Sequence, residues 1–238
     1  MTGEVEIEVT LNEGVSQSIN SRLLNSCIEY LIYQRQQVPL PFHELKRLVE
    51  DGLDTGARER PFSKRSLSSE YKKAMKMYQD LQCLFNHINK LFSSTSVNAA
   101  MIIFGSTAVS PKERYSVTFP NANQEDSTDI PARVSNSACR KMIQSLISNQ
   151  ELGSFKDISP TSMLVFIQAS RTSAIEWFRP KPTFKPPNRG QSCKITLRTA
   201  RSGQQMEEST APDQNADDWM WFQAPVIIRG YRQRIGIL

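Results

Sequence analysis

The sequence predicts an α+β fold in which three principal helices pack on a mainly antiparallel β-sheet. Two observations support this prediction. Three long segments place their apolar residues at helical spacing, and several shorter segments are apolar or alternate between apolar and polar residues. These elements do not follow the regular strand–helix order of a parallel sheet. The 238 residues suffice for a sizeable core, and we expect one domain over residues 1–238.

A strand and a helix are expected first. Residues 4–11 alternate acidic with apolar side chains, which indicates a half-buried strand at a sheet edge. Residues 15–36 form an amphipathic helix that Pro39 and Pro41 end. Gln34 projects into the apolar half of this helix. Either it hydrogen-bonds the turn at Pro39 or it contacts a partner, because a buried polar group needs a hydrogen-bonding partner.

The next segments predict a long helix followed by a hairpin. Residues 43–50 favour a short helix, and the polar residues 51–66 favour a mobile loop. Residues 67–92 carry a broad apolar stripe, so we expect this helix to be the central one, lying across the sheet. The apolar run 97–104 and the alternating segment 115–119 predict the two strands of a hairpin.

The third helix follows a polar segment, 121–133, that we expect to be a mobile loop. Residues 135–148 have helical spacing, but they hold more apolar residues than one helix face needs. Ile143 is therefore either a core residue or a contact residue. Residues 162–168, an apolar run, predict a further strand.

Two more strands are expected near the C-terminus. They cover residues 193–199 and 219–229. The residues between them, 201–218, are polar and poor in large apolar side chains, which favours a mobile loop.

The sequence contains no recognisable catalytic or metal-binding motif, so we expect a protein that is not an enzyme and needs no cofactor or metal. His43 and His87 have no metal-binding spacing, and the carboxylates of Asp217 and Asp218 are typical of a loop surface. Four separated cysteines indicate reduced, mostly buried thiols in the cytosol or nucleus. We expect no signal peptide, because the first residues are acidic, and no membrane-spanning segment.

The charge of +5 allows a second class of function, a basic nucleic-acid-binding module. Residues 177–181 and 184–185 combine basic and aromatic side chains, as single-stranded nucleic-acid sites do. The same residue types are enriched at protein–protein hot spots, so composition does not decide between the two.

Four segments carry a resemblance to a known family. They are YQRQQVPLPF at 33–42, SPKE at 110–113, EWFRPK continuing to PNRG over 176–190, and WFQAPV followed by GYR over 221–232. The chain resembles the comet protein family, which binds the spindle-checkpoint protein Mad-two, from Gln17 to Arg232 and in the same order.

The resemblance implies a HORMA-like domain with a C-terminal region that wraps around the body. It implies an adaptor that binds closed Mad-two as a mimic of a second HORMA protomer and so blocks its dimerisation. The adaptor would deliver Mad-two to an AAA+ ATPase for conversion to the open form, so that the mitotic checkpoint complex is disassembled and the checkpoint silenced. The implied location is the nucleus and cytoplasm, with spindle or kinetochore association in mitosis.

The resemblance also implies site residues. Gln34 and Ile143 match positions that contact Mad-two, although human-type members have an aromatic residue where this chain has Ile143. Pro180 and Lys181 match a pair associated with engagement of the ATPase. Trp177 and Phe178 are instead expected to anchor the wrapping segment in the core, as are Trp221 and Phe222.

Overall fold

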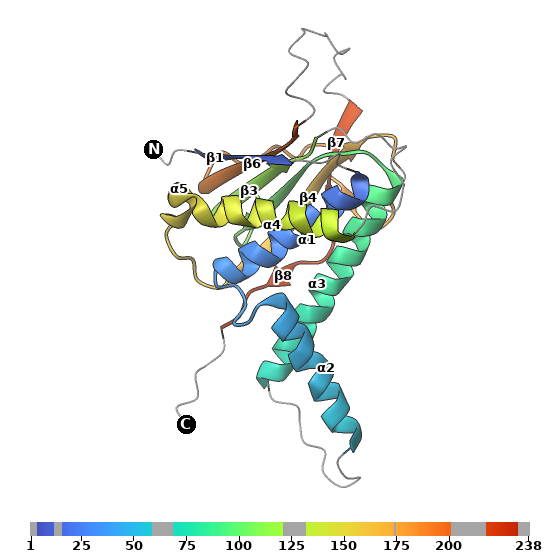
Figure 1. Cartoon of the computed structure of the whole chain (residues 1–238), viewed down its shortest axis with the longest axis vertical. Coiled ribbons are helices and arrows are strands. Elements are labelled where there is room, and N and C mark those ends of the chain that lie inside the picture. Colours follow the sequence, from blue (N-terminus) through green and yellow to red (C-terminus); the bar gives the residue numbers. More distant parts are fainter. Residues whose placement is uncertain are drawn as a thin grey trace.

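The computed structural model describes residues 4–11, 16–58, 69–120, 132–173, 175–200 and 218–232, and it confirms a mixed α+β architecture (Figure 1). The helices are α1 (Gln17–Gln34), α2 (Phe42–Arg58), α3 (Ser69–Ser94), α4 (Ala132–Ser148) and the short α5 (Gln150–Gly153). The strands are β1 (Glu4–Leu11), β2 (Val97–Phe104), β3 (Glu113–Thr118), β4 (Ser162–Ser170), β5 (Arg179–Pro180), β6 (Gln191–Thr199), β7 (Trp219–Gln223) and β8 (Ile228–Arg229).

The strands form one sheet in the order β1-β6-β3-β2-β4-β7-β5, with β8 beside β4. The predicted hairpin is present, because β2 and β3 pair antiparallel. Most pairings are antiparallel, as expected, but β6 pairs parallel with both β1 and β3. The N-terminal strand lies at the sheet edge, as predicted. Two of its acidic residues face cations on the neighbouring strand β6, with Glu6 3.3 Å from Lys194 and Glu8 2.6 Å from Arg198.

The middle helix is α1. Ser16 caps it, since the Ser16 side chain accepts a hydrogen bond from the backbone N–H of Ile19 at 3.3 Å. This helix packs against both α3 and α4. The expectation that α3 would be the central helix is therefore wrong. α1 lies between α3 and α4, and its aliphatic residues from Ile19 to Ile32 are buried.

The main core lies between the helices and one face of the sheet. Alternate residues of β2, such as Ile102, face this core, while Met101 and Ile103 face a smaller cluster on the other side. Strand β4 alternates in the same way. Phe184 and Trp221 pack on the smaller cluster. The two central strands are thus covered on both faces, which explains why they read as unbroken apolar runs.

The loop predicted at 51–66 is wrong in its first half. Helix α2 continues to Arg58, although Gly52 and Gly56 lie within it. Its first half is anchored by Leu45 and Val49, which are buried and one turn apart, and it packs on α3. Residues 59–66 lie outside the described part of the chain.

The other two predicted loops fall mostly outside the described residues. α4 begins at Ala132, so residues 132–133 are helical, and the prediction for 121–131 is not addressed. Strand β7 begins at Trp219. Residues 201–217, in the third predicted loop, are likewise not described.

The strand predicted over 219–229 is interrupted. β7 and β8 both pair with β4, but Gln223 is opposite Phe166 and Ile228 is opposite Met163. Four residues on one strand therefore span two on the other. Pro225 lies within this interruption, where its missing N–H cannot join the ladder.

None of the helices within the described ranges combines the length and the hydropathy that crossing a bilayer requires.

Candidate partner-binding surface

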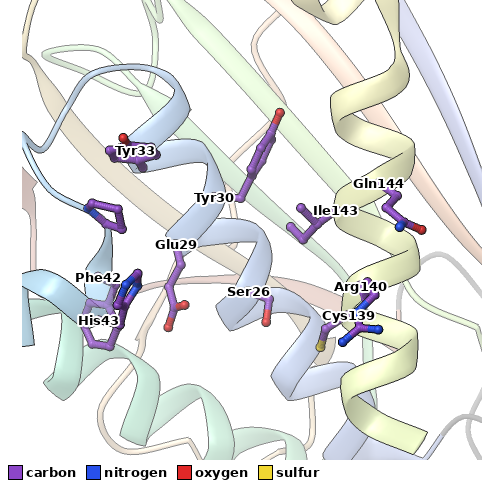
Figure 2. Close-up of a pocket in the computed structure, with 11 residues that line it drawn as sticks. Ser26, Glu29, Tyr30, Tyr33, Phe42, His43, Cys139, Arg140, Ile143 and Gln144 are labelled. Atoms are coloured by element: carbon purple, nitrogen blue, oxygen red, sulfur yellow. The ribbon is translucent and has the colours of Figure 1, made fainter.

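A hollow of about 420 Å³ lies where α1, α4 and the start of α2 meet (Figure 2). We define the α1–α4 surface as this hollow together with the exposed residues that continue it along both helices. The lining residues are Ser26, Glu29, Tyr30, Tyr33, Pro41, Phe42, His43, Cys139, Arg140, Ile143 and Gln144. α1 ends at Gln34, before Pro39 and Pro41, and α2 begins at Phe42, which lines the hollow together with Pro41.

The α1 side of the hollow is a single stripe of side chains. Ser26, Glu29, Tyr30 and Tyr33 follow one another at helical spacing, so they share one face of α1. This face lies opposite the buried residues of the helix. Tyr33 is 47% exposed, so much of its ring faces solvent beside the hollow.

The α4 side shows why this helix has a surplus of apolar residues. Met142 and Leu146 are buried in the core. Ile143 packs partly against the core and also lines the hollow, while Ile147 is 65% exposed. One face of α4 therefore anchors the helix, and the adjacent face carries apolar side chains toward solvent.

Gln34 and Ile143 lie on adjoining parts of this surface. Gln34 lines a second, smaller hollow of about 80 Å³ with Ile147, and Tyr30 lines both hollows. Gln34 is exposed. The bond within the turn after α1 is instead made by Gln37, whose Nε2 donates to the carbonyl of Arg35 at 2.6 Å, while its Oε1 accepts from the backbone N–H of the distant Thr161 at 2.8 Å. The Gln34 side chain is therefore not needed for the turn, and it is exposed.

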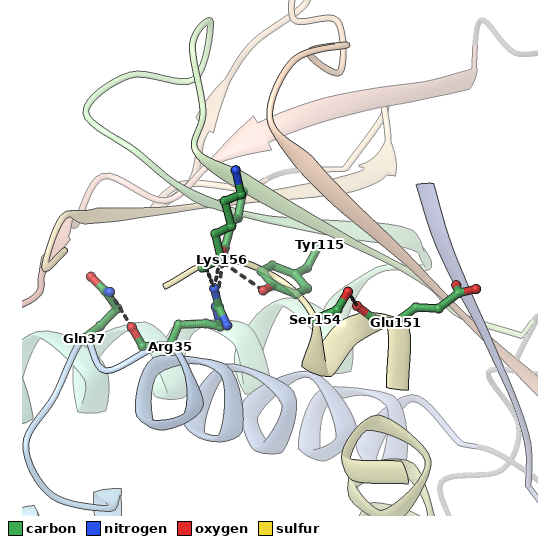
Figure 3. Close-up of polar contacts among 7 residues, drawn as sticks. Arg35, Gln37, Tyr115, Glu151, Ser154 and Lys156 are labelled. Carbon is green, nitrogen blue, oxygen red and sulfur yellow. Dashed lines mark hydrogen bonds and ion pairs between the residues drawn. The ribbon is translucent and has the colours of Figure 1, made fainter. Parts of the chain in front are cut away.

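A buried ion pair holds the end of α1 that carries Gln34 (Figure 3). The Arg35 guanidinium donates to both carboxylate oxygens of Glu113 on β3, with Nε 2.9 Å from Oε2. It also donates to the carbonyl of Lys156 at 2.5 Å. The Tyr115 hydroxyl donates to Glu113 at 2.9 Å, and burial raises the Tyr115 pKa, so the phenol stays neutral as a donor. The position of Gln34 is thereby tied to β3.

Pro180 and Lys181 lie elsewhere. Pro180 is on β5, the last strand in the sheet order, whereas α4 packs against β1 at the other end. Pro180 is exposed, and the backbone N–H of Lys181 donates to the carbonyl of Trp221 at 2.7 Å. The two predicted contact residues Gln34 and Ile143 therefore lie in a different region of the molecule from Pro180 and Lys181.

The aromatic residues expected to anchor the C-terminal half do so, with one detail the sequence did not indicate. Phe178 and Phe222 are buried. Trp177 stacks on His87 of α3 with ring centroids 4.1 Å apart, so His87 is a packing partner and not simply a solvated side chain.

Sequence reasoning missed three residues of the α1–α4 surface. Tyr33 belonged to a quoted motif but was not singled out, and Ile147 was treated as part of a helix with surplus apolar residues. The third residue is Glu29, which belongs to no motif of the sequence. The available signal was that surplus on α4, because apolar side chains beyond those that one buried face requires must point toward solvent or a partner.

The described residues do not assemble an obvious catalytic or metal centre. Within them, no group of three His, Cys, Asp or Glu side chains could hold a metal ion. Burial raises the pKa of the Cys27 thiol, and it raises that of Cys193 to about 12. Both thiols are therefore protonated and unreactive at neutral pH. Cys83 is exposed and Cys139 half-buried, so only half of the cysteines are buried as expected.

The basic–aromatic segment offers little for stacking bases. The Phe184 ring stacks on Phe166 with centroids 4.2 Å apart, and its edge contact with Trp221 is 5.6 Å. The Trp177 ring already stacks on His87. One face of each of these rings is therefore already covered, which leaves less aromatic surface for stacking bases.

The described residues thus combine a mixed α+β fold with a hollow and exposed apolar side chains beside it, an arrangement typical of a binding protein. The p31comet family, described as "Mad1 and Cdc20-bound-Mad2 binding", matches residues 2–233. The chain therefore belongs to the p31comet family. Mad2 is the Mad-two protein of the resemblance described above.

Two curated relatives are similar to nearly the whole chain. The MAD2L1-binding protein of Mus musculus is 26% identical over 223 residues, which cover 92% of this chain and 76% of the relative. The MAD2L1-binding protein of Homo sapiens is 27% identical over 223 residues, covering 92% of this chain and 77% of the relative. Both are named as binding proteins.

Proposed function

We propose that this chain is a non-enzymatic adaptor that binds closed Mad2 through the α1–α4 surface. The observation that carries the proposal is the position of Gln34 and Ile143. These residues are far apart in sequence, yet they lie on adjoining hollows that share Tyr30. Exposed Tyr33 and Ile147 extend the same region. Exposed apolar side chains gathered in this way mark a protein-binding surface.

The apolar residues of this surface supply most of the binding free energy. Burial contributes about 25 cal/mol for each Å² of apolar surface removed from water, before the costs of association. Gln34 adds a directional hydrogen bond from the end of α1. The Arg35–Glu113 pair holds that end in place, so little ordering is required when the partner docks.

Residues 1–238 form a single HORMA-like domain in this proposal, since the α+β architecture is compatible with that fold. By occupying the place of a second HORMA protomer, the chain blocks Mad2 dimerisation. Pro180 and Lys181 engage an AAA+ ATPase, which converts Mad2 to the open form. Because α4 packs near β1 and Pro180 lies at the other end of the sheet, both partners can bind together. Disassembly of the mitotic checkpoint complex and silencing of the checkpoint follow.

The proposed location is the nucleus and cytoplasm, with spindle or kinetochore association in mitosis. Imaging a fluorescent fusion through the cell cycle tests it. Exclusion from both compartments, or absence from mitotic structures, would contradict it.

Two double variants test the two surfaces separately. Gln34→Ala with Ile143→Ala is expected to remain folded but to lose closed Mad2, bound to a Cdc20 peptide, in a pull-down. Pro180→Ala with Lys181→Ala is expected to retain Mad2 and to lose ATPase-driven conversion to the open form. Each variant serves as the folded control for the other. Retention of Mad2 by the first variant rejects the assignment of the α1–α4 surface.

A further inference from the structure

Glu29 is the acidic residue that lines the hollow. It lies on the outward stripe of α1, between Ser26 and Tyr30, and its carboxylate points toward the space beside Phe42 and His43 (Figure 2). The side chain is half-buried, and desolvation raises the pKa of its carboxyl group. An ionised carboxylate that is half-buried is incompletely hydrated. It therefore needs a cation or hydrogen-bond donors to compensate.

Other shielded acids of the protein have such compensation. Glu113 is fully buried and pairs with Arg35, and Asp80 is 3.1 Å from Lys76. Among the described residues, no Lys, Arg or His lies within ion-pair distance of Glu29.

Two basic side chains that line the same hollow, His43 and Arg140, are candidates for an ion pair with Glu29. The imidazole of His43 is highly exposed and lies 3.9 Å from Glu44 instead. Arg140 is exposed and lies across the hollow on α4 (Figure 2). Neither is positioned to neutralise Glu29, so the carboxylate faces the opening of the hollow without a partner of its own.

We infer that Glu29 recognises a lysine or arginine side chain of the bound protein and thereby sets the orientation in which that protein docks. This inference rests on the proposed function and names the chemistry of the partner surface. The partner presents a large apolar side chain that fills the space between Tyr30, Phe42 and Ile143, and a basic side chain beside it that reaches Glu29. Charge complementarity of this kind gives specificity and register more than bulk affinity.

The role predicts opposite effects on binding and on stability. In the free chain the Glu29 charge is desolvated and uncompensated, so Glu29→Gln leaves the protein equally stable or more stable. In the complex the same substitution removes the ion pair and weakens binding. A residue that merely supports the fold would lose stability on substitution, and its loss of binding would follow its loss of stability.

Calorimetric titration with closed Mad2 bound to a Cdc20 peptide measures the effect. Glu29→Gln is expected to bind about tenfold more weakly, as typical for the loss of one well-placed ion pair, and with a smaller dependence on salt. Glu50→Gln makes the same change at an exposed carboxylate outside the hollow, so it is expected to bind as the unsubstituted chain does.

A charge exchange identifies the partner residue. Glu29→Lys is expected to abolish binding, and one Lys→Glu or Arg→Glu substitution in Mad2 is expected to restore it. Unchanged affinity and salt dependence for Glu29→Gln would overturn the inference while leaving the proposed function intact. No binding by the unsubstituted chain would overturn both.

Discussion

Arg35 follows directly after the proposed contact residue Gln34 and joins three parts of the chain through its backbone N–H and its guanidinium. It caps the end of α1, pairs with Glu113 on β3, and bonds the carbonyl of Lys156 after α5. Glu113 has no exposed surface. Removing one member of such a pair leaves the other charge buried without compensation, which costs far more than the net contribution of the pair itself.

Arg35→Met is therefore expected to lower the free energy of unfolding by roughly 3–5 kcal/mol, the range typical of a broken buried ion pair. Lys194→Ala removes an exposed ion pair with Glu6 and is expected to cost less than about 1 kcal/mol. Urea denaturation followed by circular dichroism measures both. Equal losses for the two variants would show that the Arg35–Glu113 pair is not the stabilising contact we describe.

The residues of the YQRQQ segment show where sequence reasoning stops. The sequence identified a glutamine that either bonds the turn or contacts a partner, and both roles are present, on different residues. Gln37 donates to the carbonyl of Arg35 within the turn, and Gln34 is exposed. The division depends on Gln36, whose φ of 51° reverses the chain direction. A left-handed glutamine has no sequence signature, so the pattern could not separate the two.

Helix α4 has two apolar faces. The sequence predicts more apolar residues on this helix than one buried face needs, but it does not show which of them are buried. Met142 and Leu146 are buried against the core, whereas Ile147 lies largely in solvent. Helical spacing fixes which residues share a face, but it does not say which of two apolar faces is covered. That depends on the packing of α4 against α1 and β1, which is a property of the fold.

The two faces are expected to respond differently to truncation. Met142→Ala should lower stability by about 2–5 kcal/mol, because it removes buried contacts and leaves a cavity. Ile147→Ala should change stability by less than about 0.5 kcal/mol, as exposed substitutions do, yet weaken binding of closed Mad2. Thermal unfolding and a binding titration on each variant give both quantities. Unchanged binding by Ile147→Ala would exclude this face from the interface.

The elements that sequence analysis misplaced are those decided by long-range packing. Two glycines in α2 cost about 1 kcal/mol each relative to alanine, and this favoured a loop. Burial of Leu45 and Val49 against the rest of the protein anchors the helix regardless. The break between β7 and β8 could be anticipated from Pro225, but the parallel pairing of β6 could not, because no local pattern specifies a distant neighbour.

On the scale of the whole molecule, the four segments that carry the family resemblance hold one another in place. Arg35 of the first pairs with Glu113 of the second. Gly190 of the third has a φ of 83°, and a Cβ there would lie 2.7 Å from the Pro111 carbonyl oxygen, so a side chain would not fit. The backbone N–H of Tyr231 in the fourth donates to the carbonyl of Gln37 at 2.9 Å.

The segments are far apart in the sequence, and these contacts bring them together in the fold. Some of their residues, such as Arg35 and Glu113, are buried and position the fold, whereas others, such as Gln34, lie at the surface. The element types, the edge position of β1 and the hairpin followed from local patterns. The α1–α4 surface did not, because its two stripes come from helices that meet only when the sheet has formed.

The reactivity of the four cysteines toward a thiol reagent tests both the folded core and the α1–α4 surface. Cys27 and Cys193 are buried and their raised thiol pKa values keep them protonated, so neither should react with a maleimide while the protein is folded. Cys139 lines the hollow, and Cys83 is exposed on α3. We expect both to be labelled in the free chain, and all four after denaturation.

Closed Mad2 should then protect Cys139 and leave Cys83 reactive. Docking on the α1–α4 surface covers the hollow that Cys139 lines, whereas Cys83 lies outside the residues that line it. Mass spectrometry of the labelled peptides, with and without Mad2, measures the two sites in one sample, so Cys83 serves as an internal control. Protection of Cys83 with continued labelling of Cys139 would place the partner on α3 instead, because the covered thiol marks the docking face.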